Sequence, residues 1–249
     1  MKKILLSLTL VTLLAACKKS DRNNGTSSDG PIDDRNTGRA ANALLSAGTY
    51  TSLQVEISYM PGYAPDAGAL SRLNTFLQAR LNKPGGITVT TRAIPAASNA
   101  VLSVSDLAAI EGANRTARSS GSTATIHILY TNGSYTESNV LGVAYRGTAV
   151  ALFGKKIHDN SGGVGQASRT KLEATVLEHE IGHLLGLVDI GTPMQTPHKD
   201  PGGSAHCNNQ NCLMYYAAET TDILGLLVTG SVPSLDAACI NDLRGNGGR

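Results

Sequence analysis

The chain has 249 residues, with 21 basic and 19 acidic side chains, a formal net charge of +2, 2 Phe and no Trp. The balanced charge and the scarcity of aromatic side chains exclude a basic nucleic-acid surface and an aromatic stacking platform for bases. Once an N-terminal export signal and the polar segment that follows it are set aside, roughly 200 residues remain, which is enough for one domain with a buried core.

The N-terminus carries the pattern of an export signal. Two lysines precede an apolar stretch at residues 4–16, which is too short to cross a bilayer comfortably. This stretch closes on Leu-Ala-Ala-Cys, ending at Cys17, and resembles a bacterial lipobox. The resemblance implies cleavage before Cys17, lipid on its thiol and anchoring to a membrane of the bacterial cell envelope. The alternative is a plain secretory signal in which Cys17 is an ordinary cysteine.

The rest of the chain divides into a tether and one folded domain. Residues 18–41 are rich in Ser, Asn, Asp, Gly and Arg and have almost no large apolar side chain. Such a segment cannot bury enough surface to order itself. We therefore predict a signal peptide at 1–17, a flexible tether at 18–48 and the functional domain at 49–249.

Apolar residues in the domain alternate with period two in some segments and recur at helical spacing in others. In chain order the predicted elements are a strand at 53–60, a helix at 65–81, a strand at 87–94, a helix at 103–118, a strand at 123–130, a hairpin of 140–145 with 148–153, a helix from 170 and a closing helix from 234. The order predicts an α+β fold in which a mixed, mostly parallel, twisted sheet packs on helices. A smaller, irregular C-terminal half ends in a helix.

The most informative segment is His179-Glu180-x-x-His183-x-x-Gly186, which lies in the helix predicted from residue 170. That helix opens on the pattern T-x-x-E, which is typical of a capping box. Residues four apart share one helix face, so both imidazoles can reach one zinc ion at about 2.0–2.1 Å. Glu180 can then take a proton from a water that the metal has acidified.

Catalytic zinc usually keeps three protein ligands and one open position. With His179 and His183 as two of them, the third must follow Gly186. The residues alone leave three candidates: Asp189, His198 and His206.

A second string, His206-Cys207-x4-Cys212-x-Met214, resembles the corresponding stretch of archaemetzincins. Together with the first motif it makes the chain resemble the metzincin clan of zinc peptidases, which have a zincin-like fold. The resemblance implies that His206 is the third ligand and that Met214 forms the turn beneath the metal. It also implies that Tyr216 can stabilise the transition state, as a tyrosine does in astacin-like enzymes.

The chain departs from the clan in the spacing of the third ligand. Compact metzincins place it three residues after the glycine, where this chain has Asp189, and the snapalysin type uses Asp there. With His206 as ligand, residues 187–205 are an insertion. His198 lies within this insertion and remains the other alternative.

The remaining cysteines bear on metals and disulfides. Archaemetzincins carry further cysteines for a structural zinc, whereas this chain has only Cys239 beyond Cys207 and Cys212. Because exported proteins keep disulfides, we expect one catalytic zinc and a Cys207–Cys212 disulfide, in which Cys239 could replace either partner. The loops do not indicate whether calcium adds stability.

The sequence therefore predicts a lipid-anchored, exported zinc endopeptidase that acts as a monomer on peptide or protein substrates and does not bind nucleic acid. Its mechanism is attack by zinc-bound water, assisted by Glu180. One alternative is a zinc-containing but non-proteolytic lipoprotein that binds a protein or glycan. Another is a metal-dependent hydrolase of non-peptide substrates.

Overall fold

The computed structural model describes residues 31–202 and 204–249, so the predicted signal peptide and Cys17 lie outside the described residues. A central sheet has the strand order β2-β1-β4-β7-β6, in which the first four strands are parallel and β6 is antiparallel to β7. Its strands are β1 (Ser52–Tyr59), β2 (Ile87–Ala93), β4 (Thr123–Tyr130), β6 (Gly142–Arg146) and β7 (Ala149–Leu152), and β3 (Val101–Leu102) pairs separately with β5 (Ser134–Tyr135). The predicted mixed, mostly parallel sheet is confirmed.

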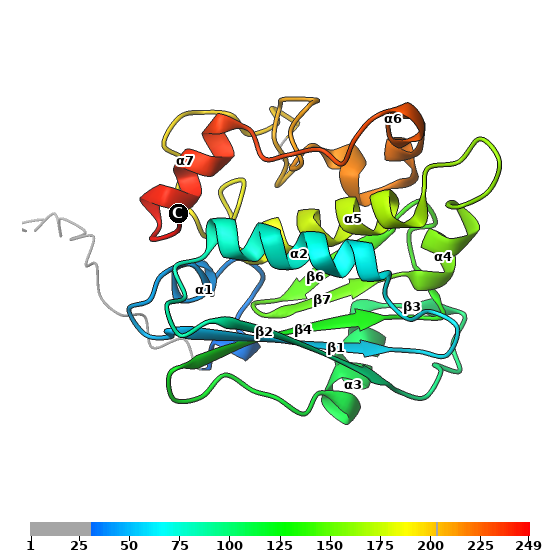
Figure 1. Cartoon of the computed structure of the whole chain (residues 1–249), viewed down its shortest axis with the longest axis horizontal. Helices are drawn as coiled ribbons and strands as arrows, with labels where there is room; N and C mark the ends of the chain where they lie inside the picture. The colour runs from blue at the N-terminus through cyan, green and yellow to red at the C-terminus, as the bar shows by residue number, and fades with distance from the viewer. Residues whose placement is uncertain (1–30, 203) are drawn as a thin grey trace, which may run out of the picture.

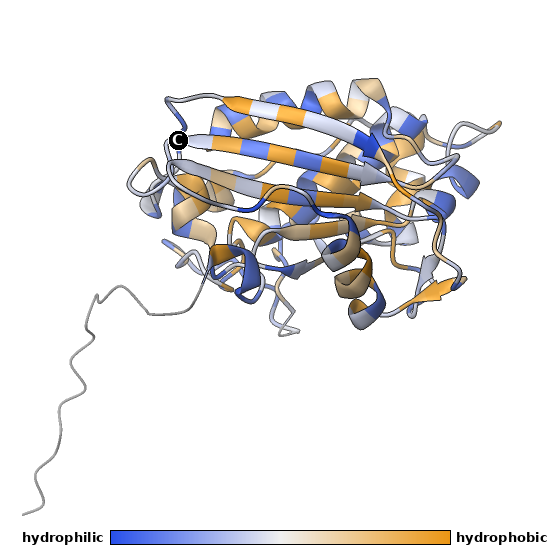
Figure 2. Cartoon of the chain, turned by 90° about the horizontal axis from the view of Figure 1, so that it is seen from below, coloured by the Kyte–Doolittle hydropathy of each residue, from blue (hydrophilic) through white to orange (hydrophobic). Residues whose placement is uncertain are grey.

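Helices cover both faces of this sheet: α2 and α5 lie side by side on one face, and α3 lies on the other (Figure 1). The helices are α1 (Ala41–Leu45), α2 (Ala67–Arg80), α3 (Val104–Asn114), α4 (Gly154–Asp159), α5 (Arg169–Leu184), α6 (Leu224–Thr229) and α7 (Ala237–Gly245), with the 3-10 turns η1 (Ile32–Asp34), η2 (Tyr216–Glu219) and η3 (Thr221–Ile223). Hydropathy alternates along several strands (Figure 2), as expected for residues that face opposite sides of a sheet.

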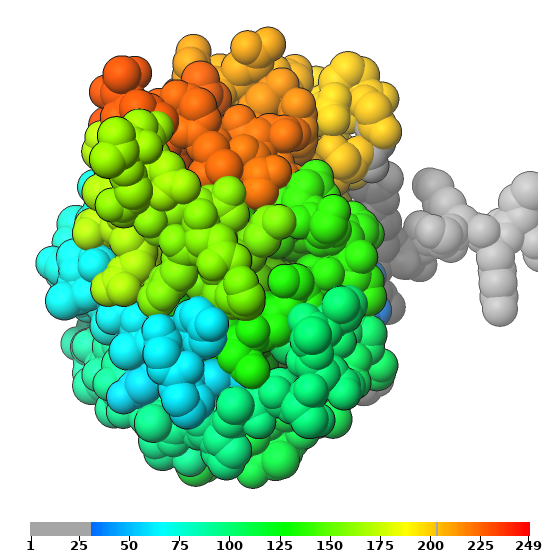
Figure 3. Space-filling view, turned by 90° about the vertical axis from the view of Figure 1, so that its right-hand side faces the viewer, coloured from blue at the N-terminus to red at the C-terminus, as the bar shows by residue number. Residues whose placement is uncertain are grey.

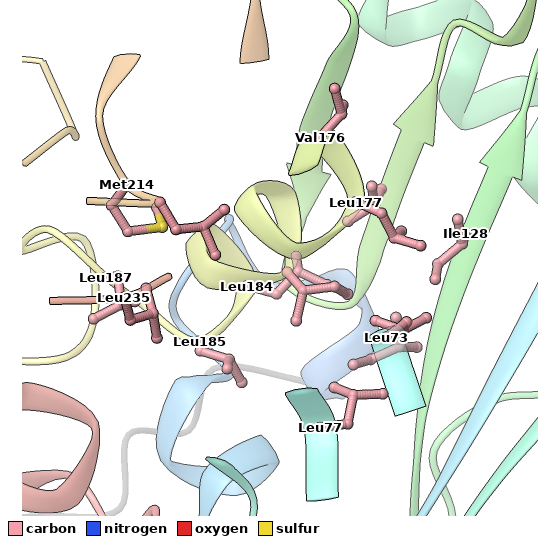
Figure 4. Packing of buried hydrophobic residues seen from close by; sticks show 14 of the residues in the cluster. Leu73, Leu77, Ile128, Val176, Leu177, Leu184, Leu185, Leu187, Met214 and Leu235 are labelled. Carbon is pink, nitrogen blue, oxygen red and sulfur yellow. The ribbon is translucent and has the colours of Figure 1, made fainter. Parts of the chain in front are cut away.

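The main core lies between the sheet and the α2–α5 layer. Leu73 and Leu77 of α2 and Leu177 and Leu184 of α5 point toward Ile128 of β4, and all five are fully buried (Figure 4). Their helical spacing is what predicted these elements. Because this face of α5 packs on the sheet, the opposite face of the helix is turned away from the sheet. The C-terminal half packs on that opposite face.

Residues 31–48, which we expected in the tether, are instead part of the folded domain. Leu44 and Leu45 are fully buried in the main core, and Asp33 is 2% exposed. The Asp33 carboxylate accepts hydrogen bonds from Arg115 and Thr148 at 2.9 Å each, in a buried ion pair. The stretch is polar on average, so its composition did not indicate that a few apolar residues bury it in the core.

The start of α5 also differs from the expectation. The N-cap is Ser168, whose hydroxyl accepts from the Lys171 N–H at 3.3 Å, so Thr170 does not cap the helix. Glu173 turns inward instead and accepts hydrogen bonds from the Asp66 N–H at 2.7 Å and the Tyr130 hydroxyl at 3.0 Å. It joins α5 to the end of β4 and to the cap of α2.

This buried carboxyl makes stability depend on pH. Burial raises the pKa of Glu173 to about 7, from an ordinary value of 4.5. The folded state then binds this proton more tightly than the unfolded state, so Glu173 lowers the free energy of unfolding as the pH rises from 4.5 to about 7. We expect Glu173→Gln to be more stable than wild type at pH 8 by about 1–3 kcal/mol, measured by urea denaturation at pH 5 and pH 8.

The exposed Glu137→Gln exchange is the matched control and should leave the pH dependence unchanged. An identical pH dependence in wild type and Glu173→Gln would contradict the prediction.

The C-terminal half rests directly on the start of α5 (Figure 3). Lys171 of α5 donates from Nζ to the Gly230 carbonyl at 2.7 Å and lies 3.5 Å from the Leu227 carbonyl, at the end of α6. Within 31–202 and 204–249, no helix combines the length and apolar character needed to cross a bilayer. The closing helix is α7, capped by Asp236, which accepts from the Cys239 N–H at 2.9 Å.

Candidate metal centre

Helix α5 places His179 and His183 one turn apart, and both are buried, with 0% and 7% exposure. Their Nε2 atoms are 3.1 Å apart. The Nδ1 atom of His179 lies 2.7 Å from the Leu213 carbonyl oxygen, which can only accept a hydrogen bond. His179 therefore carries its proton on Nδ1, and the lone pair on Nε2 is directed toward His183.

His206 reaches this pair from the C-terminal half. Its ring centroid is 5.3 Å from that of His179 and 5.2 Å from that of His183. One nitrogen from each of the three histidines, together with a carboxylate oxygen of Glu219, lies within 4.8 Å of all the others. The structure thus brings together the two histidines of the helix motif and one of the three candidates for a third ligand.

Glu219 is the member of this group that the sequence did not reveal. Its carboxylate oxygens lie 3.6 Å from Nε2 of His179, 3.9 Å from Nε2 of His183 and 3.3 Å from Nε2 of His206. Although burial alone raises the pKa of Glu219, its contacts with His179 and His206 lower that pKa below its usual range. A negatively charged oxygen therefore faces the three imidazoles.

The electrostatics suit a cation. Burial and the neighbouring His179 lower the pKa of His183 to about 3, so its imidazole is neutral at pH 7 and free to act as a ligand. Burial and the nearby Glu219 carboxylate raise the pKa of Glu180 well above its usual value. A divalent cation beside these groups opposes that shift, because it favours the ionised carboxylate.

The side chain of Glu180 extends from α5 toward β6, the outer strand of the sheet. It is fully buried, and within the described residues neither carboxyl oxygen has a well-formed hydrogen bond. A β-carbon added at Gly142, the first residue of β6, would lie 3.0 Å from Glu180 Cγ. The side chain is thus held between the helix and β6, where the Ala144 backbone acts on its carboxyl but no well-formed hydrogen bond ties down either oxygen.

Met214 is fully buried and lies against α5, on the same side as Leu187 and Leu235 (Figure 4). Its sulfur occupies the space that a side chain at Gly182 would need, so the motif has a glycine between its two histidines for a steric reason. Leu213, the preceding residue, supplies the carbonyl that orients His179. The Met214 segment therefore packs against the helix motif and orients one of its histidines.

We expect Gly182→Ala to lower the free energy of unfolding by about 1–3 kcal/mol, because the new methyl group overlaps the Met214 sulfur in a fully packed region. The measurement is urea denaturation. Gly112→Ala is the matched control, since its β-carbon in α3 meets nothing within 4 Å and alanine favours a helix. Equal stability of Gly182→Ala and wild type would contradict this packing argument.

The other candidates from the sequence lie outside this group. The Asp189 side chain is 51% exposed, with its carboxylate 4.0 Å from Lys199 Nζ. His198 is buried but its Nε2 lies 2.7 Å from the Asp242 carboxylate. Tyr216 is 41% exposed and packs on Tyr215 at a centroid distance of 4.6 Å.

The disulfide that we expected between Cys207 and Cys212 is not formed. Both residues and Cys239 are buried free thiols. Cys212 and Cys239 approach each other most closely, with their sulfurs 3.6 Å apart, which is far beyond the roughly 2.05 Å of a disulfide bond.

Comparison with known proteins identifies the family. A reprolysin profile, described as metallo-peptidase family M12, matches residues 69–224, more than half of the chain and all of α5. The chain belongs to metallopeptidase family M12. This M12 chain is therefore a zinc metallopeptidase, and its substrates are peptides.

Two solved structures are similar to this M12 chain. Archaemetzincin from Methanopyrus kandleri is 15% identical with a TM-score of 0.51, and the match covers 79% of this chain and 96% of that one. Metalloproteinase-II from Bacteroides fragilis is 17% identical with a TM-score of 0.45, and the match covers 88% of this chain and 57% of that one. The first likeness supports the predicted zincin-like fold. No curated protein sequence matches the chain.

The residues of the M12 chain fit the zinc that this family uses. The Nε2 atoms of the three histidines all lie within 3.9 Å of a Glu219 oxygen, and Nε2 of His206 has no well-formed hydrogen bond among the described residues. Three nitrogen ligands with one further position are the donor set of catalytic zinc.

Proposed function

We propose that the chain is an exported endopeptidase, held at the cell envelope by lipid on Cys17, in which His179, His183 and His206 bind the catalytic zinc. One observation carries the proposal. Three buried imidazoles converge on a point beside Glu180, whose carboxyl has no well-formed hydrogen bond among the described residues. A site built only to hold a metal has no need for an uncommitted base next to it.

The choice of His206 over Asp189 and His198 follows from where the side chains lie. His206 shares one group of ligand atoms with His179 and His183, whereas Asp189 is half-exposed beside Lys199. Glu219 is the fourth donor of the group. Because catalytic zinc keeps a position for water or substrate, we assign the three histidines as ligands and infer that Glu219 withdraws when substrate binds.

Zinc bound by these ligands supplies a Lewis acid that acidifies a water and polarises the scissile carbonyl. Glu180 takes the proton from the attacking water and delivers it to the leaving amine. Burial of its carboxyl excludes bulk water, so the proton passes to the amine rather than to solvent. Tyr216 can contribute to stabilising the transition state only after a movement toward the ligands, since it now packs on Tyr215.

The outer strand β6 is the proposed binding edge for an extended peptide. It is antiparallel to β7 and lies at the end of the strand order. The Ala144 carbonyl already accepts a hydrogen bond from the Thr37 hydroxyl at 3.0 Å, so a bound peptide pairs with the rest of this edge or displaces that hydroxyl. Addition of a peptide strand uses the same kind of contact, next to Glu180.

Digestion of a proteome-derived peptide library by the full chain tests the proposed activity. We expect cleavage inside peptides, loss of cleavage with a chelator and recovery with zinc. Cleavage only at peptide ends would refute an endopeptidase, and no cleavage would favour the non-proteolytic alternative.

The proposed location depends on Cys17. We expect Cys17→Ser to abolish incorporation of a labelled fatty acid and to move the protein from the membrane to the soluble fraction of cells, because a lipid on one thiol is the proposed anchor. Labelling followed by cell fractionation measures this. An acylated, membrane-bound Cys17→Ser protein would disprove the anchor.

A further inference from the structure

A cavity of about 270 Å³ lies on the side of α5 that faces α2. It is lined by residues of α2, by Glu178 of α5, and by Leu213 and Leu235 of the C-terminal half. Glu180, two residues after Glu178, extends toward β6 instead, so the cavity and the proposed base lie on different faces of the helix. Pockets for drug-sized molecules usually begin at about 300 Å³, which means that this cavity suits a smaller ligand.

The buried part of the cavity is apolar except for one carboxylate. Leu213 is fully buried, Leu235 is 5% exposed, and Phe76 of α2 is partly buried. Glu178 is 4% exposed, and its Oε1 atom has no well-formed hydrogen bond among the described residues. Arg72 Nε lies 3.4 Å from this oxygen, but the Arg72 side chain is 45% exposed at the mouth of the cavity. The buried carboxylate therefore retains the capacity to accept a hydrogen bond from a ligand.

Arg80, at the end of α2, brings a positive charge to the same cavity. Its Nε atom is buried, and within 31–202 and 204–249 it has no hydrogen-bond partner. Burial and the neighbouring Arg244 guanidinium lower the pKa of Arg80, while Glu178 acts in the opposite direction. Glu178 thus balances only part of the positive charge, and an anionic group on a ligand would balance the remainder.

These two buried polar atoms restrict the class of ligand. A purely apolar molecule would leave both Glu178 Oε1 and Arg80 Nε without hydrogen bonds, which is unfavourable in a buried site. A simple anion such as phosphate would satisfy the guanidinium but would be repelled by the carboxylate. A small molecule with one ammonium group, one carboxylate and one apolar group matches the whole lining.

We propose that this cavity binds a free α-amino acid with an apolar side chain, such as leucine. The ammonium group of the ligand donates to the Glu178 carboxylate, and its carboxylate accepts from the Arg80 guanidinium. Its apolar side chain packs against Phe76, Leu213 and Leu235.

A ligand in this cavity would contact the segment that orients a histidine of the metal centre. Leu213 lines the cavity, and its carbonyl oxygen lies 2.7 Å from His179 Nδ1. The Leu213 N–H donates to the Ser234 carbonyl at 2.9 Å, and Ser234 also lines the cavity. The amino acid therefore acts on the position of His179 from the side of α5 that faces α2, as an effector and not as a substrate.

The test is titration calorimetry of the full chain with leucine. We expect one site per chain. N-acetyl-leucine lacks the ammonium group and leucinamide lacks the carboxylate, so each should bind about 10–100-fold more weakly, the factor expected when a hydrogen bond to a charged group is lost. The proposal would be overturned if N-acetyl-leucine bound as tightly as leucine, or if leucine, methionine and phenylalanine all failed to bind at millimolar concentration.

Two variants assign the charged groups of the cavity. Glu178→Gln should abolish the preference for leucine over N-acetyl-leucine, and Arg80→Met should abolish the preference for leucine over leucinamide. Each result compares two ligands on one protein, so a small loss of stability does not affect it. Arg39→Met is the matched control, because Arg39 is exposed and lies outside the cavity lining. Unchanged preferences in Glu178→Gln and Arg80→Met would refute the assignment.

An amino acid can also chelate zinc, so a further control separates the cavity from the metal centre. His183→Ala removes a proposed zinc ligand but no part of the cavity lining, and it should still bind leucine. Loss of leucine binding in His183→Ala alone would place the ligand on the metal and contradict the proposal. Because leucine binding is measured without a peptide substrate, its outcome does not depend on the proposed peptidase activity.

Discussion

Replacement of Glu180 by alanine is expected to leave the proposed catalytic zinc bound and to lower kcat by about 10²–10⁴-fold, the usual contribution of a general base. Glu180 is not one of the four donors grouped at the three-histidine site, so its loss does not remove a ligand. Glu219 is the carboxylate whose charge acts on Glu180, and it faces the three histidines.

The measurement is steady-state cleavage of a peptide found in the library digestion, together with the zinc content of each variant. Glu180→Gln is the matched control for shape, and it should lose as much activity as alanine because an amide cannot accept the proton. Wild-type kcat in either variant would exclude Glu180 as the base. Loss of zinc in Glu180→Ala would show that its role is to hold the metal.

Replacement of His206 by alanine is expected to weaken binding of the catalytic zinc by more than about 100-fold, the upper end of the loss caused by removing a residue that only orients a ligand. Activity should disappear at ordinary zinc concentrations, because two histidines and Glu219 remain as the only donors of the group. Peptidase activity titrated against zinc in a chelator-buffered solution gives the affinity.

Asp189→Ala is the matched comparison, since Asp189 stands at the spacing used by compact metzincins but is half-exposed in the structure. It should keep wild-type zinc affinity. A variant pair in which Asp189→Ala loses zinc and His206→Ala retains it would reverse the ligand assignment.

The elements that sequence reasoning predicted well are those whose periodicity is local. Strand β1 and helix α2 follow directly from apolar spacing, and the i, i+4 relation of His179 and His183 needs only a helix. What it missed depends on tertiary contacts. Glu219 reaches the histidines from a 3-10 turn, and its spacing from them in sequence matches no known motif. Glu173 was predicted to cap α5 but accepts a buried hydrogen bond from Tyr130 instead.

The surroundings of Asp33 and His198 could not be predicted for the same reason. Asp33 looked like a tether residue because its partner Arg115 is 82 positions away. His198 looked like a third catalytic ligand or a loop residue because neither Asp242 nor Cys239 is near it in sequence. In both cases the polar side chain is buried, and a polar residue can be buried only if the fold supplies its partner.

If Cys17 carries the proposed lipid, folding of residues 31–48 into the domain limits how far the enzyme can act from the membrane. With lipid on Cys17, only the 13 residues at 18–30 separate the anchor from the folded domain. Even fully extended, a segment of that length spans at most about 45 Å, whereas a tether reaching residue 48 would allow about 110 Å. The working zone is then a thin layer next to the bilayer. Proteins that are embedded in the same membrane or pressed against it come within reach of the catalytic site, while proteins that diffuse freely beyond that layer do not.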